Sequence, residues 1–324
     1  MKGADSKQLR ELVARYQTKL HTRETVLNVL AGLGLIGFGI VLVPLISSHR
    51  IPTAFVPEAT STPITVNAFS GLALTGEAAV VYDLSTGEVL FEKNGTKQLP
   101  LASLTKLLTM YAAANALSKT ASVTISETAL AQDGDSGLTL GETFRLSDLE
   151  RFALVASSND AAEAIAEAAS LAHKSSNREL LASAAAAAGL LQTYANNGTG
   201  LDVSTYKSGG YGSAEDVARL AGALIKTSPE IAHATIEPYV TARSLSGQSH
   251  TLPNTNQDIV HIPNPLLSKT GFTDLAGGNL VVVFDAGINH PVAVVVLGST
   301  KEGRFTDVDH LVLRTLSHFA GIAP

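Results

Sequence analysis

One uncharged apolar run near the N-terminus constrains this chain more than any other feature. Residues 26–46 carry no charge, and Asn28 is their one amide side chain. At 1.5 Å per residue, a helix of that length spans about 30 Å, the thickness of a hydrocarbon core. No second run of this kind occurs in the 324 residues, which excludes a membrane protein with several spans. We therefore expect a single membrane helix over residues 26–46.

The same run could instead be a cleaved secretory signal. A signal peptide has a shorter apolar region and ends in a cleavage site flanked by small residues. Leu45, Ile46, Ser47 and Ser48 do not form a good site of this kind. We therefore favour an uncleaved anchor.

The residues before the run form a basic arm. Residues 1–25 contain six of the 23 Lys and Arg residues and three of the 29 Asp and Glu residues. Because basic flanks stay on the cytoplasmic side, we expect a cytoplasmic arm over 1–25, a cell-membrane location and an exported remainder. That remainder has 17 basic and 26 acidic residues, which disfavours a nucleic-acid partner. The absence of cysteine excludes disulfides and thiol nucleophiles.

The part after the run divides into a linker and one folded domain. Residues 47–75 are rich in Ser, Thr and Pro and lack helical periodicity, which is typical of an extended tether. Residues 76–324 are numerous enough to form one sizeable core.

Strand patterns occur at both ends of this domain. Residues 78–83 and 88–92 flank a short Gly-containing turn and predict a hairpin, and residues 279–286 and 291–298 are Val-rich. Helical patterns lie between the two pairs, and a last helix is expected after Thr306. This order predicts the α+β class, with an antiparallel sheet built from both chain ends and a helical cluster between them.

Capping residues predict where several helices begin. Ser147 with Glu150 has the capping-box pattern, in which each side chain binds an orphan backbone N–H, and Asp160 with Glu163 has a similar pattern. Two further helices are expected to begin at Ser176 and Ser213.

Ser103 and Lys106 form the first of three short patterns that could carry chemistry. They stand three residues apart at a predicted helix start, so they share a face near the end of the helix that favours a developing anion. A serine hydroxyl needs a base to take its proton, and lysine serves only if burial or a second cation lowers its pKa from about 10.4 toward neutrality. Leu107, Leu108 and Tyr111 indicate a buried helix, so the lysine should be partly desolvated.

The other two patterns are Ser157-Ser158-Asn159 and Lys269-Thr270-Gly271. The first falls at a break between predicted helices, where a hydroxyl can relay a proton and an amide can bind a substrate amide. The second precedes the predicted 279–298 strand pair, where glycine lets a peptide lie close to a strand edge and the Lys and Thr side chains suit a carboxylate. Taken singly, each could be a plain polar turn.

The chain also contains copies of two of these patterns. Residues 204–207 repeat the Ser-x-x-Lys spacing in a Gly/Ser-rich loop, and residues 175–177 repeat Ser-Ser-Asn at a predicted helix start. We interpret both copies as having no catalytic role. Arg304, near the last predicted helix, is interpreted as a salt-bridge residue.

Together and in this order, the three patterns are the signature of penicillin-binding proteins and class A β-lactamases. The chain resembles the serine-type D-alanyl-D-alanine carboxypeptidases, which are low-molecular-mass penicillin-binding proteins. The resemblance extends over about residues 76–320 and implies a β-lactamase/transpeptidase-like fold. It rests on residues 79–83, 86–87, 102–106, 157–162, 197–201, 269–271 and 276–277.

The resemblance implies a role for each matching residue. Ser103 would be the acylated nucleophile, Lys106 its base, and Ser157 the group that passes the proton to the leaving amine. The backbone N–H groups of Ser103 and Phe272 would form the oxyanion hole. Substrate binding would fall to four residues: Asn159, Lys269, Thr270 and Gly271.

The substrate implied by the resemblance is a peptidoglycan stem peptide ending in D-Ala-D-Ala. β-Lactam antibiotics would acylate the same serine, and the membrane would be a partner through residues 26–46. The resemblance implies no metal and no organic cofactor, and no H-E-x-x-H pattern occurs among the nine histidines.

The sequence departs from the family in its attachment to the membrane. Typical members have a cleaved signal and a C-terminal β-rich domain with an amphipathic helix, whereas here the apolar run lies at the front. We expect a DD-carboxypeptidase. A DD-endopeptidase acting on cross-links, a β-lactamase and a catalytically silent wall-binding protein are the alternatives. The β-lactamase is disfavoured because no E-x-x-L-N stretch lies between Asn159 and Lys269.

Overall fold

The structure, a computed structural model, describes residues 67–287 and 289–321. The predicted arm over 1–25, the apolar run over 26–46 and most of the predicted linker lie outside these residues. Within the described ranges, none of the helices combines the length and the apolar character that a membrane crossing requires. The domain limits derived from the sequence therefore stay predictions.

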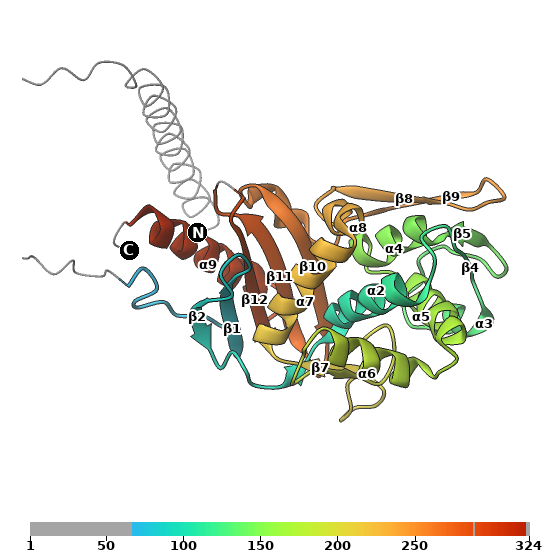
Figure 1. Cartoon of the computed structure of the whole chain (residues 1–324), viewed down its shortest axis with the longest axis horizontal. Coiled ribbons are helices and arrows are strands. Elements are labelled where there is room, and N and C mark those ends of the chain that lie inside the picture. The colour runs from blue at the N-terminus through green and yellow to red at the C-terminus, as the bar shows by residue number, and fades with distance from the viewer. Residues whose placement is uncertain (1–66, 288, 322–324) are drawn as a thin grey trace, which may run out of the picture.

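A five-stranded antiparallel sheet forms one half of the folded part (Figure 1). Its order is β10-β11-β12-β1-β2, so the first strand pairs with the last, and Val81 lies opposite Val294. The predicted sheet from both chain ends is confirmed. The strands are β1 (Ala78–Asp83), β2 (Val89–Lys93), β10 (Pro265–Thr273), β11 (Gly277–Asp285) and β12 (Pro291–Ser299).

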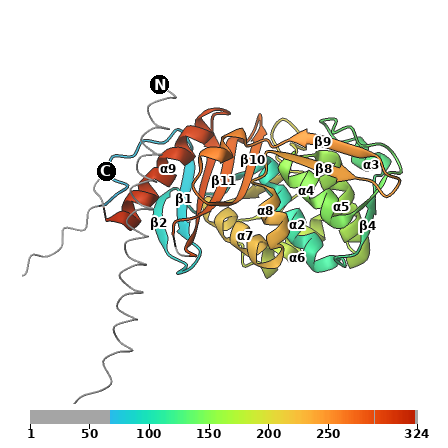
Figure 2. The ribbon, with the colours of Figure 1, turned by 90° about the horizontal axis from the view of Figure 1, so that it is seen from above.

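Strands β11 and β12 are apolar on both faces because both faces are covered. Val281 and Val295 point into a core shared with α7 (Ala214–Thr227), which belongs to the helical half. Val282 and Val294 point to the other face, against the C-terminal helix α9 (Gly303–Ala320). Figure 2 shows α9 on one side of the sheet and the helical half on the other.

The helical half is formed by the chain between β2 and β10, as predicted, and α2 lies at its centre. Eight of the twelve residues of α2 are buried, among them the polar residues Thr105, Lys106 and Thr109. In addition to α7, the helices are α2 (Thr105–Ala116), α3 (Glu127–Leu130), α4 (Leu146–Val155), α5 (Asn159–His173), α6 (Asn177–Ala187) and α8 (Pro229–Ala234). Two 3₁₀ turns accompany them: η1 (Ala102–Leu104) and η2 (Gln257–His261).

Three small sheets lie around these helices and were not predicted from the sequence. Five of the seven strands have only two or three residues, too few for a clear alternation of apolar and polar side chains. The other two have five residues each and alternate in burial, but they were missed. The β8–β9 hairpin projects along the helical half (Figure 1). The strands are β3 (Leu99–Pro100), β6 (Tyr194–Ala195) and β7 (Gly210–Gly212) in one sheet, β4 (Ser122–Thr124) and β5 (Thr143–Arg145) in the second, and β8 (Tyr239–Arg243) and β9 (Ser249–Pro253) in the third.

The capping box predicted at Ser147 is wrong. Helix α4 has Arg145 as its N-cap and no side-chain capping bond, so Ser147 lies inside the first turn. The reason is that strand β5 ends at Arg145 and runs directly into the helix. Glu150 does not reach back to a cap but is buried, and burial raises its pKa to about 7.

The cap predicted at Asp160 is also displaced, by two residues. The N-cap of α5 is Ser158, whose Oγ accepts a hydrogen bond from the backbone N–H of Ala161 at 3.1 Å. Asp160 lies in the first turn and accepts from the backbone N–H of Ser136. By contrast, the predicted caps at Ser176 and Ser213 are confirmed, and the last helix begins at Gly303 rather than after Thr306.

Ser158→Ala should lower the free energy of unfolding by about 1 kcal/mol or slightly more, because it removes the α5 cap. It also removes the acceptor of the Ser136 hydroxyl, which lies 2.7 Å from Ser158 Oγ. Ser147→Ala should cost less than about 0.5 kcal/mol. Urea denaturation measures both, and equal losses would contradict these assignments.

Candidate active site

The residues predicted to carry chemistry meet where the helical half joins strand β10. Ser103 lies in η1 and Lys106 in the first turn of α2. Ser157 and Asn159 lie at the junction of α4 and α5. The third pattern, at residues 269–271, lies inside strand β10. The sequence did not predict this strand, so the pattern had been placed just before the strand pair at 279–298.

Ser103 and Lys106 are in direct contact. The Lys106 Nζ lies 2.9 Å from the Ser103 Oγ. Ala102, just before the serine, has φ +48°, a left-handed conformation that is strained for a residue with a side chain. Ala102 and Leu104 are buried while Ser103 is only half-buried, so the turn presents the hydroxyl at the protein surface.

Two further acceptors surround the Lys106 amine. Its Nζ lies 2.7 Å from Asn159 Oδ1 and 2.8 Å from the carbonyl oxygen of Thr199. A neutral amine has two N–H donors and one lone pair. When both N–H groups donate to Asn159 and Thr199, the lone pair is left for the Ser103 hydroxyl, which then donates to it.

The orientation of the Asn159 amide is fixed by the neighbouring loop. Its Nδ2 donates to the carbonyl oxygen of Asp133 at 2.5 Å, which leaves Oδ1 facing Lys106. Asn159 therefore contacts the amine of Lys106 directly. A substrate-binding role for its amide stays a prediction.

Burial lowers the pKa of Lys106 from 10.5 to about 7, against the opposing effect of the negative charge of Asp160. The amine is enclosed by the packed helices around α2, and removal from water disfavours its charged form. At neutral pH a substantial fraction of Lys106 is therefore the free base, the form that can accept a proton.

Lys269 contacts the second serine in the same way. Its Nζ donates to Ser157 Oγ and to the carbonyl oxygen of Thr270, each at 2.8 Å. Burial, followed by the positive charges of Lys106 and Arg304, holds the pKa of Lys269 well below its ordinary range. The site thus holds two buried amines, each on a serine hydroxyl.

Strand β10 is an edge strand of the large sheet and lies directly against η1. A Cβ at Gly271 would lie 2.9 Å from the carbonyl oxygen of Leu101 and 3.3 Å from the backbone nitrogen of Ser103, so only glycine allows this approach. Thr270 Oγ1 donates to Thr255 Oγ1 at 2.6 Å, and the Phe272 side chain is exposed. A strand at the edge of a sheet, next to the Ser103 hydroxyl, is the kind of element to which an extended peptide can add.

Two contacts of this site had no signal in the sequence. The Thr199 carbonyl that binds Lys106 is a backbone group, which any residue type could supply. The Arg304 guanidinium, which we interpreted as a salt-bridge residue, donates to the carbonyl oxygen of Gly271 on strand β10 at 2.6 Å.

The copies of the patterns lie elsewhere. Ser204 and Lys207 pair through their backbones in a turn where Lys207 is exposed. Ser176 caps α6. Neither copy has the buried amine that distinguishes Ser103 and Lys106.

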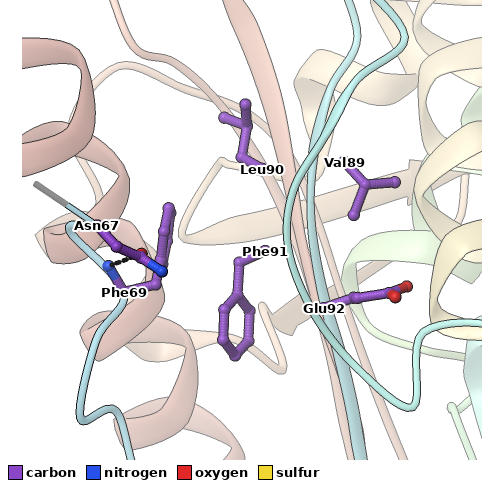
Figure 3. A pocket seen from close by; sticks show the side chains of 6 residues that line it. All are labelled: Asn67, Phe69, Val89, Leu90, Phe91 and Glu92. Atoms are coloured by element: carbon purple, nitrogen blue, oxygen red, sulfur yellow. Dashed lines mark hydrogen bonds between the residues drawn. The ribbon is translucent and has the colours of Figure 1, made fainter. Parts of the chain in front are cut away.

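A depression of about 560 Å³ lies at β2, at the edge of the sheet opposite β10 (Figure 3). Phe69 and Phe91 stack there with ring centroids 5.3 Å apart, and Glu92 is the one titratable residue in its lining. None of the residues that line it carries a hydroxyl or an amine. Within the described ranges, no group of three or more His, Asp or Glu residues is placed to hold a metal ion.

The low pKa of Lys106 makes folding stability depend on pH. The folded state binds fewer protons here than the unfolded state, so the penalty is complete below about pH 7 and fades as the pH rises toward 10.5. We expect the unfolding free energy of the wild type to rise relative to that of Lys106→Met by roughly 3 kcal/mol between about pH 7 and 9.5.

Urea denaturation across that range measures this difference, with Lys207→Met as the exposed control. The hydrogen bonds lost in Lys106→Met shift the whole curve by a constant. Loss of the Lys106 charge also lets the pKa of Lys269 rise, which adds to the difference in the same direction. A flat difference would contradict a low pKa.

Similarity to known proteins covers the same region. The family described as D-alanyl-D-alanine carboxypeptidase matches residues 65–301. D-alanyl-D-alanine carboxypeptidase DacF of Bacillus subtilis is 32% identical over 250 residues, which are 75% of this chain and 62% of that protein. The chain thus spans less than two thirds of that relative.

Two further matches bear on the site. A protein of Escherichia coli named D-alanyl-D-alanine endopeptidase is 29% identical over 266 residues, covering 79% of this chain and 82% of that protein. The crystal structure of Penicillin-Binding Protein D2 from Listeria monocytogenes, in the ampicillin-bound form, matches with a TM-score of 0.64 and 29% identity over 75% of this chain and 98% of that one. The expected penicillin-binding-protein fold is confirmed.

Proposed function

The chain belongs to the D-alanyl-D-alanine carboxypeptidase family, and from that premise we propose that it is a serine DD-carboxypeptidase. It removes the terminal D-Ala from peptidoglycan stem peptides through an acyl-enzyme on Ser103. The observation that carries the proposal is the pair of amine contacts, with Lys106 on Ser103 and Lys269 on Ser157.

Acylation begins with a proton transfer from Ser103 to Lys106. The neutral amine takes the hydroxyl proton as Oγ attacks the carbonyl carbon of the penultimate D-Ala. The developing oxyanion binds to the backbone N–H groups of Ser103 and Phe272. One such donor is worth about 3 kcal/mol of transition-state stabilisation.

The leaving amine of the terminal D-Ala needs a proton, and Ser157 supplies it. Ser157 passes on the proton held by Lys106, the C–N bond breaks and free D-Ala departs. A water molecule then attacks the ester on Ser103, gives one proton to Lys106 and releases the shortened peptide, and Lys106 returns the proton to Ser103.

The substrate lies along the edge of β10. Lys269 and Thr270 bind its terminal carboxylate, Gly271 allows the close approach and Asn159 binds its backbone. A bound carboxylate favours the charged form of Lys269, whose pKa in the free protein is low because of burial and two neighbouring cations. Asn159 also orients the Lys106 amine, as their 2.7 Å contact supports.

β-Lactams acylate the same serine in this proposal. The Listeria relative was crystallised with ampicillin bound, and 75% of this chain matches its fold. We also propose a single-pass protein with a cytoplasmic arm over 1–25, an anchor over 26–46, a linker over 47–75 and an extracytoplasmic catalytic domain over 76–324. The apolar run and the basic arm support this topology.

A DD-endopeptidase is the second candidate. The Escherichia coli relative with 29% identity carries that name, and the same acyl-enzyme chemistry would cleave a peptide cross-link. A catalytically silent wall-binding protein is disfavoured by the intact contacts between amines and hydroxyls.

Fluorescent penicillin should label the wild type covalently and should not label Ser103→Ala, because the acylated oxygen is lost. Ser204→Ala is the matched control, since it removes the serine of the exposed copy and should label like the wild type. Labelling is read on a denaturing gel. An unlabelled wild type would rule out the acyl-enzyme.

The two peptidase activities are separated by their products. The purified protein should release D-Ala from a pentapeptide ending in D-Ala-D-Ala, measured by chromatography. Cleavage of a cross-linked muropeptide without release of D-Ala from the pentapeptide would favour the endopeptidase.

The rate of penicillin acylation should rise with pH about tenfold per unit below pH 7 and level off above it, because Lys106 must be neutral to accept the proton. Stopped-flow measurements from pH 5 to 9 test this, with circular dichroism confirming that the protein stays folded. A rate that rises only above pH 9 would mean that the amine has its ordinary pKa.

A further inference from the structure

We propose that Thr109 is a positioning residue for the base Lys106 and acts through the loop formed by residues 197–201. The inference rests on the proposed function of Ser103 and Lys106. Thr109 lies one helical turn after Lys106 on α2, on the same face, and is only 1% exposed.

Two side chains of α2 hold two consecutive carbonyl groups of this loop. Thr109 Oγ1 donates to the carbonyl oxygen of Gly198 at 2.7 Å. Lys106 Nζ donates to the carbonyl oxygen of Thr199 at 2.8 Å. The Gly198 and Thr199 carbonyl groups belong to adjacent peptide units, so a rotation of the first peptide unit also displaces the Thr199 carbonyl group.

The shape of the loop is set within the loop itself. Asn197 Oδ1 accepts from the backbone N–H of Gly200 at 2.8 Å, and Asn197 Nδ2 donates to the carbonyl oxygen of Leu201 at 3.0 Å. These bonds fold the loop but do not fix where it sits against α2. The Thr109 contact ties it to the helix that carries Lys106.

Packing encloses the loop between α2 and α5, away from water. A Cβ at Gly198 would lie 2.6 Å from the Cβ of Ala166 on α5, so the glycine occupies a gap between α2 and α5. Gly198 and Thr199 are both buried. A Gly198 carbonyl without its donor would therefore be unpaired and away from water, which favours rotation of the peptide toward a new partner.

Such a rotation removes one of the two acceptors that orient the Lys106 amine. The lone pair is then no longer held toward Ser103, so the plateau rate of acylation falls. A carbonyl acceptor also stabilises the ammonium form, so its loss lowers the pKa of Lys106. Asp160 on α5 and Lys269 on β10 are the charged groups that face Lys106, and replacing the uncharged Thr109 changes neither.

The test is the rate of penicillin acylation of the full chain as a function of pH. Thr109→Val keeps the side-chain shape and removes the hydroxyl. It should lower the plateau rate by about 10- to 100-fold, the scale of an approximately 1 Å misplacement, and move the acidic limb of the profile to lower pH. Thr109→Ser restores the hydroxyl and should recover the plateau to within about threefold of the wild type.

Thr315→Val is the matched control. Thr315 is also buried in a helix, and its Oγ1 donates to the carbonyl oxygen of Leu311 at 2.7 Å, but it lies on α9 across the sheet. It should leave the acylation rate within about twofold and the profile unshifted, since a loss of stability alone does not touch the base.

The outcomes separate this inference from the proposed function. A wild type that is not acylated defeats the function itself. An acylated wild type with an unchanged rate and profile in folded Thr109→Val defeats only the role of Thr109, as does a folded Thr109→Ser that is as slow as Thr109→Val. If Thr109→Val does not fold, Thr109→Ala replaces it with the same expected direction.

Discussion

The burial of one amine in helix α2 is the constraint on which the rest of the site depends. Water would keep Lys106 charged, so the helices around α2 must exclude it and protein groups must replace its hydrogen bonds. Asn159 and Thr199 supply these acceptors, and Ser103 occupies the remaining direction. A well-packed apolar side chain at this position would make the folded state more stable. A buried lysine here therefore indicates a chemical role and not a structural one.

A second buried amine makes the arrangement electrostatically coupled. The positive charge of Lys106 disfavours the charged form of Lys269, and Arg304 adds a second positive charge near Lys269. Without a ligand, the site therefore contains several groups that can become positively charged and few that are negatively charged. A bound anion would favour the charged forms of these amines and so raise their pKa values.

Regular spacing explains which parts of this fold could be predicted from the sequence. The contact of Ser103 and Lys106 follows from helical geometry, and the Val-rich strands follow from burial on both faces. Strand β10 was missed because Ser268, Lys269 and Thr270 have no apolar alternation. The cap at Ser147 failed because a local pattern carries no information about the strand that runs into the helix. Backbone partners such as the Thr199 carbonyl leave no trace in residue types.

The pairing of β1 with β12 imposes an order of assembly on the chain. The two strands are adjacent in space but more than 200 positions apart in sequence, and β10 also comes late. During synthesis, the segment with Ser103 and Lys106 emerges long before the partners that enclose it. Contacts at such separation make folding slow, and Lys269 reaches Ser157 only after β10 has joined the sheet. A nascent chain that lacks its final strands therefore has neither Lys269 at Ser157 nor Gly271 against η1.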